Sequence, residues 1–413
     1  MKHSITSRQY LFGFILITTL FFMWGLSMGL LDVLNKHFQE TLDVSRAQSG
    51  FLQMAYFGAY FIIALPAGIF ITKNGYKAGI IVGLSLFAIG ALLFVPASYV
   101  LTYGFFLFAL FVLALGLGFL ETAANPYSTA LGAPETAEAR LNLSQSFNGL
   151  GQFAGPVIGG AFFFSETDSL QASHGAVTTT YIVVAAVVIL LIILFARTKL
   201  PDLREEEEAL DAANVEQHQR SIWSHKEFTF GVVAQFFYVA AQVGVSAFFL
   251  NLTTETWDGM TSQRAAFLLS MGLLLFMVGR FVSTALMTRI APTRLLIIYA
   301  AINTALCAAI MTGATHIVTY AAIGVFFFMS MMFPTIFAMG VKNLGSQTKI
   351  GSSFMIMAIV GGAIMPYFMG KLGDLTHIST SYILPLLCFV VVGVYAFVYP
   401  QMVHGQAGAP VAA

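Results

Sequence analysis

Twelve apolar stretches alternate with short polar connections along the chain, and each stretch is long enough for one membrane-spanning helix. Such a helix needs about 20 predominantly apolar residues to cross the hydrocarbon core of a bilayer. The pattern predicts helices at residues 10–34, 50–72, 77–97, 102–131, 140–164, 177–196, 227–251, 262–288, 293–312, 316–341, 349–370 and 379–400. We therefore expect an all-α membrane protein with twelve transmembrane helices.

One long charged segment divides the predicted helices into six and six. This segment, residues 197–226, contains a run of four glutamates and has almost no apolar periodicity. A solvated linker is typical of such a sequence, and a regulatory or partner-binding segment is the alternative. The sequence predicts an N-terminal six-helix bundle at 1–196, a cytoplasmic linker, a C-terminal bundle at 227–400 and a cytoplasmic tail at 401–413.

Short basic connections lie at equivalent places in the two halves. Lys73 and Lys77 follow the second predicted helix, and Arg289 and Arg294 follow the eighth. Internal repeats of this kind are typical of secondary transporters, including those with the major facilitator architecture. The pattern therefore predicts two pseudo-symmetric bundles.

The composition indicates a bilayer as the surrounding medium. The chain of 413 residues is 58% hydrophobic and 9% charged, whereas soluble domains carry roughly a quarter charged residues. Its net charge is zero, so no basic surface indicates a nucleic-acid partner. The two cysteines fall in apolar runs, which argues against a disulfide framework.

The distribution of Lys and Arg residues predicts the orientation in the membrane. With the N-terminus inside, fourteen of them lie in cytoplasmic segments and four lie in outer loops, while Arg280 lies within a helix. Cytoplasmic loops carry an excess of these residues. We expect a multi-pass protein of a bacterial-type inner membrane with both termini in the cytoplasm. The first apolar run is longer than the apolar core of a signal peptide, so we expect it to be retained.

Glu121 is the only charged residue between Lys77 and Glu135, within a stretch apolar enough to lie inside a bilayer. Because an apolar environment favours the neutral form of a carboxyl group, Glu121 is a candidate to take up a proton on one side and release it on the other. The alternative is a structural carboxyl hydrogen-bonded to Asn125, one helical turn later. Asp32, which closes the first apolar run, is a second candidate for proton coupling, or else a helix-end carboxylate in water.

Two predicted helices carry polar faces that suit a neutral polyol. Amides and phenols offer both hydrogen-bond donors and acceptors, and the three amides of the fifth helix fall within an arc of roughly 60°. The candidate sugar contacts are Gln145, Asn148 and Gln152 in the fifth helix and Gln235, Tyr238 and Gln242 in the seventh. The alternative is that these groups join helices to one another, as polar side chains often do in membrane bundles.

Three further residues complete the candidate site. Trp24 and Asp32 lie eight residues apart on the first helix, which would place an aromatic platform near the carboxylate. Asn125 is a further candidate for sugar binding. Arg280 either extends to the cytoplasmic interface or pairs with a carboxylate or the opposite half and helps to lock one conformation.

Several chemistries lack their sequence signature. The chain contains no G-x-x-x-x-G-K-[ST] loop for ATP, no H-E-x-x-H zinc motif and no G-x-S-x-G nucleophile elbow, and its eight histidines are scattered. We therefore expect a transporter rather than an enzyme, with no metal site and no cofactor, and with a proton as coupling ion.

The segment at residues 119–126, Phe-Leu-Glu-Thr-Ala-Ala-Asn-Pro, closely resembles the L-fucose–proton symporter family of the major facilitator superfamily. The resemblance extends over most of the chain, at residues 76–80, 140–143, 145–148, 279–281, 333–337, 342–345 and 351–354. It implies a sugar taken up with a proton, with Asp32 and Glu121 as coupling and binding carboxylates. It also implies that Gln145 and Asn148 contact the sugar.

One departure from the family concerns the sugar. Fucose-transporting members are similar in having an asparagine-rich stretch before the helix-one aspartate, whereas this chain has Met28-Gly29-Leu30-Leu31 there. Fewer polar groups would therefore face the sugar from helix one. Relatives include glucose, galactose and N-acetylglucosamine carriers, and some animal relatives use sodium.

Together these observations predict a monomeric monosaccharide–proton symporter in the lipid bilayer that works by alternating access. Within transport, an exporter of drugs or lipids is the alternative, although the polar faces of the fifth and seventh helices argue against it. A sugar sensor that binds without transport is the alternative from another class.

Overall fold

A computed structural model describes residues 6, 8–132, 137–164, 170–198, 221–287, 289–342, 344 and 347–407. Within these ranges the regular secondary structure is helical throughout. Most of the predicted linker, from residue 199 to residue 220, lies outside the described residues, as do residues 408–413 of the predicted tail.

The first half of the chain forms six long helices and one short helix. In chain order they are α1 Leu11–Thr41, α2 Arg46–Ser49, α3 Phe51–Asn74, α4 Tyr76–Val100, α5 Tyr103–Ala130, α6 Ala137–Phe163 and α7 Leu170–Arg197.

The second half is divided into shorter pieces. Its helices are η3 Ile222–Ser224, α9 Lys226–Ala247, α10 Phe249–Thr256, α11 Ser262–Met287, α12 Pro292–Met311, α13 Thr315–Met329, α14 Met332–Val341, α15 Thr348–Met357, η5 Ala358–Val360, α16 Gly361–Leu375, η6 Thr380–Tyr382 and α17 Ile383–Ala407.

Each of the twelve predicted stretches contains helix. In the described part of the chain, eleven helical segments are long and apolar enough to cross a membrane. The predicted helix without a counterpart among these eleven is the fifth, at residues 140–164, which corresponds to α6; its amides and Arg140 make it the most polar of the long helices. Its 27 residues extend over about 40 Å, more than the hydrocarbon core requires.

Several predicted boundaries are wrong. Helix α1 continues to Thr41 rather than ending at residue 34, because its last turns place amides against other helices instead of in water. The seventh, tenth and eleventh predicted helices are each interrupted, near Phe248, near Met331 and at η5. Hydropathy cannot reveal these breaks, since the residues on both sides are equally apolar. Helix α17 also extends to Ala407, into the segment predicted as a tail.

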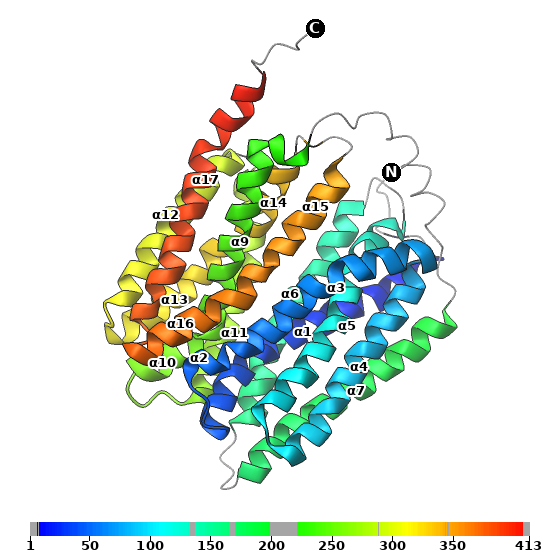
Figure 1. The fold of residues 1–413 in the computed structure, drawn as a ribbon, viewed down its shortest axis with the longest axis vertical. Coiled ribbons are helices and arrows are strands. Elements are labelled where there is room, and N and C mark those ends of the chain that lie inside the picture. Colours follow the sequence, from blue (N-terminus) through cyan, green and yellow to red (C-terminus); the bar gives the residue numbers. More distant parts are fainter. Residues whose placement is uncertain are drawn as a thin grey trace.

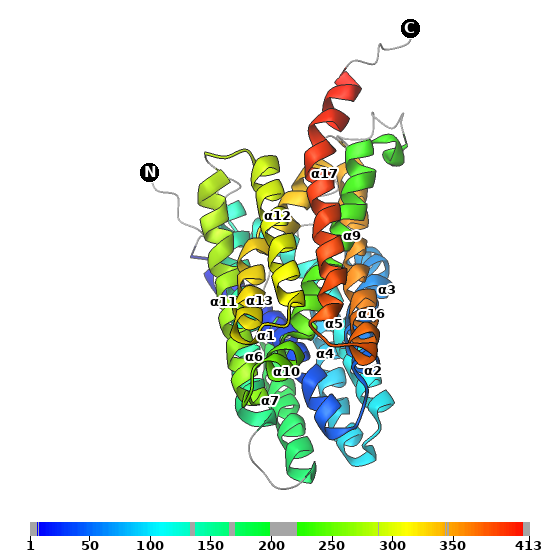
Figure 2. The same ribbon diagram turned by 90° about the vertical axis from the view of Figure 1, so that its left-hand side faces the viewer.

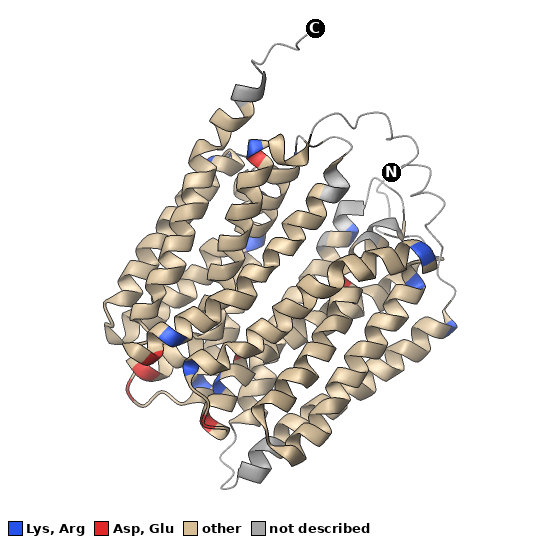
Figure 3. Ribbon diagram, viewed as in Figure 1, with Lys and Arg blue, Asp and Glu red and all other residues tan. Residues whose placement is uncertain are grey.

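The helices of the two halves form two groups that lie side by side (Figure 1), and the second group faces the viewer in the turned view (Figure 2). Charged residues gather mainly at the two ends of the bundle, as Figure 3 shows. Across the boundary between the groups, α6 packs on α11, and α2 and α3 pack on α16. A site between the groups is therefore formed by residues distant in sequence.

Helices α1 and α6 approach each other backbone to backbone. A Cβ atom on Gly25 of α1 would lie 2.8 Å from the carbonyl carbon of Asn148 and 3.0 Å from the backbone nitrogen of Gln152. A Cβ atom on Gly151 of α6 would lie 2.7 Å from the backbone nitrogen of Leu26. Only glycine permits this spacing. The glycine contacts therefore fix the distance between α1, which carries Asp32, and α6, which carries the row of amides.

Candidate functional site

Asp32 lies in the interior of α1 and faces a cavity between the two groups of helices. Its side chain is only 7% exposed, yet within the described residues its carboxylate has neither a hydrogen bond nor an ion pair. The sequence left open whether Asp32 is a helix-end carboxylate in water. Because α1 continues to Thr41, the structure places Asp32 away from the end of its helix. A buried carboxylate without a protein partner is costly unless a proton or a ligand neutralises or binds it.

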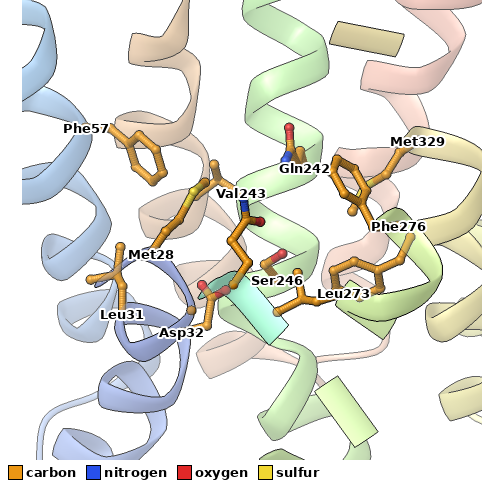
Figure 4. Close-up of a pocket in the computed structure, with 13 residues that line it drawn as sticks. Met28, Leu31, Asp32, Phe57, Gln242, Val243, Ser246, Leu273, Phe276 and Met329 are labelled. Carbon is orange, nitrogen blue, oxygen red and sulfur yellow. The ribbon is translucent and has the colours of Figure 1, made fainter. Parts of the chain in front are cut away.

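About 410 Å³ of space not filled by atoms lies between the lining residues, which Figure 4 shows, and this volume includes space that is open to solvent. The first half contributes Met28, Gly29, Leu31, Asp32, Phe57 and Gln152, and the second half contributes Gln242, Val243, Ser246, Leu273, Phe276, Phe326 and Met329. Most of the lining is apolar, with a few polar groups from both halves. This combination is typical of small-molecule sites, where apolar walls hold the ligand and polar groups orient it.

Of the amides on α6, one lines the cavity and another joins α6 to α1. Gln152 lines the cavity and donates from Nε2 to the side-chain oxygen of Asn148, at 2.7 Å. Asn148 in turn donates to the backbone oxygen of Phe21 on α1, at 3.2 Å. The side chain of Asn148 therefore links α1 to the cavity-lining amide, and the described cavity does not include Asn148 itself.

Glu121 lies on α5 and is partly exposed. In the part of the chain that the structure describes, its carboxylate has no hydrogen bond and no ion pair. Asn125 donates to the backbone oxygen of Glu121, at 3.1 Å, so it does not hold the carboxyl group as the structural alternative required. Gln145 donates to the side-chain oxygen of Asn125, at 3.2 Å, which places both amides beside Glu121 but outside the cavity around Asp32.

The polar face of α9 is only partly available to a ligand. Gln242 lines the cavity, whereas Tyr238 is fully buried and donates to the backbone oxygen of Met329, at 2.9 Å. Gln235 is also fully buried, and neither of its amide atoms has a hydrogen-bond partner among the described residues. Trp24 is partly buried against Phe21 and does not line the cavity that contains Asp32.

Arg280 makes contacts within the second half. Its guanidinium carbon lies 4.8 Å from the centre of the Phe276 ring, and its Nε donates to the backbone oxygen of Ser330, at 3.3 Å. Over the described residues no carboxylate pairs with Arg280. Its predicted part in locking a conformation is therefore untested by this arrangement, although Phe276 connects it to the cavity wall.

Sequence reasoning missed Ser246 and the apolar wall opposite Asp32. Ser246 lies one helical turn after Gln242 on the same face of α9, so the four-residue spacing could have identified it. The phenylalanines of the wall could not have been selected, because the chain contains 40 phenylalanines and many of them are buried in the core without lining the cavity. Within the described residues, no group of three or more His, Cys, Asp or Glu side chains could hold a metal ion.

Comparison with known proteins gives one consistent result. The sequence model of the Major Facilitator Superfamily matches residues 13–366. A glucose/galactose transporter of Brucella abortus is 39% identical over 401 residues, which cover 96% of this chain and 96% of that protein. The L-fucose-proton symporter of Escherichia coli is 38% identical over 415 residues and is covered to 94%. The crystal structure of the transporter FucP in the outward conformation superposes with a TM-score of 0.68 at 36% identity, covering 95% of this chain and 99% of FucP.

Proposed function

This chain belongs to the major facilitator superfamily, and from that premise we propose that it imports a monosaccharide together with protons by alternating access. The sugar is L-fucose or a related hexose such as glucose or galactose, in line with the names of the two relatives. The observation that carries the proposal is the cavity between the halves, which is lined by the buried Asp32 from the first half and by Gln242 and Ser246 from the second half.

The chemistry of the cavity suits a neutral sugar. A carboxylate accepts hydrogen bonds from sugar hydroxyls, whereas the amides of Gln152 and Gln242 and the hydroxyl of Ser246 can donate as well as accept. Phe57 and Phe276 supply flat apolar surfaces for the C–H faces of a sugar ring. Because these groups come from both halves, a bound sugar favours the two halves coming together. The whole site lies in one chain, so a monomer is sufficient.

Proton coupling is assigned to Glu121 with Asp32. A charged carboxylate near the middle of a bilayer costs about 3 kcal/mol on insertion scales, and protonation removes that cost when the protein closes around it. Glu121 is partly exposed in this conformation and so can exchange a proton with water, whereas Asp32 faces the cavity. Uptake should accordingly slow as the pH rises through the range where Glu121 loses its proton.

The Lys and Arg distribution supports placing the chain in a bacterial-type inner membrane with both termini in the cytoplasm. The two six-helix halves, residues 1–196 and 227–400, would then rock against each other around the sugar. In this orientation the end of the bundle that carries α2 and α10 faces the outside.

Replacement of Glu121 by Gln tests the coupling. For one proton per sugar, a gradient of one pH unit supports about tenfold accumulation, because that gradient is worth about 1.4 kcal/mol. Proteoliposomes with Glu121→Gln should exchange labelled sugar across the membrane yet accumulate none under a pH gradient. Asp258→Asn, which changes an exposed carboxylate, is the matched control and should accumulate sugar normally.

Tenfold accumulation by Glu121→Gln would remove this residue from the coupling role. Imposing pH and sodium gradients separately on the unaltered protein, with a panel of hexoses, identifies the ion and the sugar. Binding without any uptake would indicate a sensor instead of a transporter.

A further inference from the structure

Two tyrosines of α3, Tyr56 and Tyr60, lie behind the wall of the cavity. Their side chains are only 1% and 8% exposed, and neither lines the cavity, whereas Phe57, the residue after Tyr56, does. Their phenol oxygens are 3.5 Å apart, within hydrogen-bond distance, and either oxygen can be the donor. The two rings pack together, with centres 5.3 Å apart. The hydroxyls therefore form a buried pair that is separate from the surface lining the cavity.

The register between α1 and α3 places Tyr56 at the depth of Asp32. Asn35 of α1 donates to the side-chain oxygen of Gln53 on α3, at 3.0 Å, and the short connection through α2 makes the two helices run in opposite directions. Asp32 is three residues before Asn35, and Tyr56 is three residues after Gln53. Both residues therefore lie about one helical turn from this contact, in the same direction along the bundle.

The second phenol lies beside the helix that carries Glu121. A Cβ atom on Gly118 of α5 would lie 3.6 Å from the Cα atom of Tyr60 and 3.8 Å from its Cδ1 atom. Glu121 follows Gly118 by three residues, so it lies on nearly the same face of α5, about one turn further along. Because α3, α4 and α5 are joined by very short connections, α3 and α5 run in the same direction. The order of depth, from the end that carries α2, is therefore Asp32 with Tyr56, then Tyr60, then Glu121.

Electrostatic interactions join this pair to both carboxylates. The phenol of Tyr56 interacts with Asp32 and with Glu121, and the phenol of Tyr60 interacts with Glu121. The phenol of Tyr181 on α7 also interacts with Tyr56. Within the described residues these are the titratable groups that act on the pair. The two hydroxyls thus lie between the two carboxylates to which proton coupling is assigned.

The carboxylates themselves are too far apart to exchange a proton directly. Tyr60 follows Tyr56 by four residues and Glu121 follows Gly118 by three, so the depths of the two carboxylates differ by about 10 Å at 1.5 Å per residue. A proton passes between two groups within about 3 Å of each other, or through one intervening water. Two hydroxyls placed along this distance divide it into shorter steps.

We propose that Tyr56 and Tyr60 carry the coupling proton from one carboxylate to the other, an inference that rests on the proton symport proposed above. Protonated Asp32 gives its proton to the oxygen of Tyr56, while Tyr56 gives its own phenol proton to Tyr60. Tyr60 in turn gives its phenol proton to the carboxylate of Glu121. Three O–H bonds break and three form, so one proton moves and both tyrosines end neutral. Because either phenol of the pair can be the donor, both hydroxyl orientations needed for a repeated cycle are available.

The direction of this relay suits import. In the orientation proposed above, Asp32 lies nearer the outside and Glu121 nearer the cytoplasm, where its partly exposed carboxyl group can release the proton to water. Water in the cavity completes the contact between Asp32 and Tyr56 where the two do not touch. Because neither tyrosine lines the cavity, the proton keeps its own route while a sugar fills the cavity.

Tyr56→Phe and Tyr60→Phe test the relay, since phenylalanine keeps each ring and removes only the hydroxyl. In proteoliposomes at equal pH on both sides, sugar added outside should drive proton entry, measured as a rise in the pH of the medium. Each variant should lower the initial rate of this proton entry at least about tenfold, because positioned proton transfer contributes about 10²–10⁴-fold to a rate. The KM and the maximal rate of sugar exchange, which needs no net proton movement, should stay unchanged.

Tyr181→Phe is the matched control. It removes a buried hydroxyl that has no hydrogen-bond partner among the described residues, from the same half of the chain. Tyr181 belongs to α7, which packs mainly on α4 and so lies outside the line between the two carboxylates. This variant should keep the proton entry and the sugar exchange of the unaltered protein.

Two results would overturn the relay. Equal losses of proton entry and sugar exchange in Tyr60→Phe would make that tyrosine a packing residue, and normal proton entry in both phenylalanine variants would show that the hydroxyls carry no proton. Neither result affects the proposed symport. The symport itself fails only if the unaltered protein shows no proton entry driven by sugar.

Discussion

Replacement of Gly25 by alanine addresses the packing that positions the site. In this structure the added Cβ atom would lie 2.8 Å from the carbonyl carbon of Asn148, whereas ordinary contacts begin at 3.4 Å. Helices α1 and α6 must therefore separate by at least about 0.6 Å. The obstacle is backbone, which cannot rotate away as a flexible side chain could, so the displacement reaches both Asp32 and Gln152.

The expected magnitude follows from this displacement. Adding a methyl group to a well-packed core costs about 1–3 kcal/mol, and hydrogen bonds to the sugar weaken as their donors and acceptors move apart. If about 1.4 kcal/mol of that cost falls on the sugar-bound state, the affinity for sugar falls about tenfold. We expect Gly25→Ala to raise the KM of sugar exchange by about this factor and to lower the thermal stability of the purified protein.

Sugar exchange in proteoliposomes measures the KM, and the fraction that stays monodisperse after heating in detergent measures stability. Gly58→Ala on α3 is the matched control, because a Cβ atom there has no atom within 4 Å. It should leave the KM unchanged and slightly raise stability, since alanine favours helix over glycine by about 1 kcal/mol. An unchanged KM and stability in Gly25→Ala would refute the argument that backbone contact between α1 and α6 sets the geometry of the site.

Two further predictions concern the amides. Asn148→Ala should raise the KM of sugar exchange severalfold while the protein still expresses, because Gln152 loses the acceptor that orients it; an unaltered KM would make Asn148 a packing residue only. Gln235→Leu should raise thermal stability, since a buried amide without partners costs about 1–3 kcal/mol and leucine has a similar size. If Gln235 binds the sugar at another stage of the transport cycle, Gln235→Leu should also slow transport. A Gln235→Leu protein that is more stable and transports at the normal rate would exclude sugar binding by Gln235.

The sequence predicted the helical part of the fold well because hydropathy is a local property. A run of about 20 apolar residues is long enough to span a bilayer whatever the rest of the chain does. The prediction of a helix at α6 is confirmed even though polar residues lower its apolarity, whereas the predictions failed at the breaks near Phe248 and Met331. Backbone geometry changes there without any change in side-chain polarity.

The location of Glu121 within a long apolar helix could likewise be anticipated, since a lone carboxylate in an apolar run has few inexpensive places to lie, whereas the sequence left two locations open for Asp32. The amide faces were identified correctly as polar faces, but the sequence could not separate cavity contacts from contacts between helices. Gln152 and Gln242 line the cavity, whereas Tyr238 donates to a backbone oxygen of its own half. That distinction depends on what lies opposite each side chain, which helical periodicity does not contain.

The sequence alone thus determined that this protein spans a membrane many times and carries isolated carboxylates within its spans, because both properties follow from residues near one another in the chain. Only the tertiary structure decided that Asp32 lines one cavity with Ser246, and that Arg46 of α2 donates from its guanidinium to Glu255 of α10 and from its backbone nitrogen to Asp374 of α16. These pairs are separated by about two hundred residues or more. Whether these residues contact one another depends on how the two bundles pack. That packing is set by glycine contacts and by the shapes of the facing helix surfaces, and neither produces a periodic pattern in the sequence.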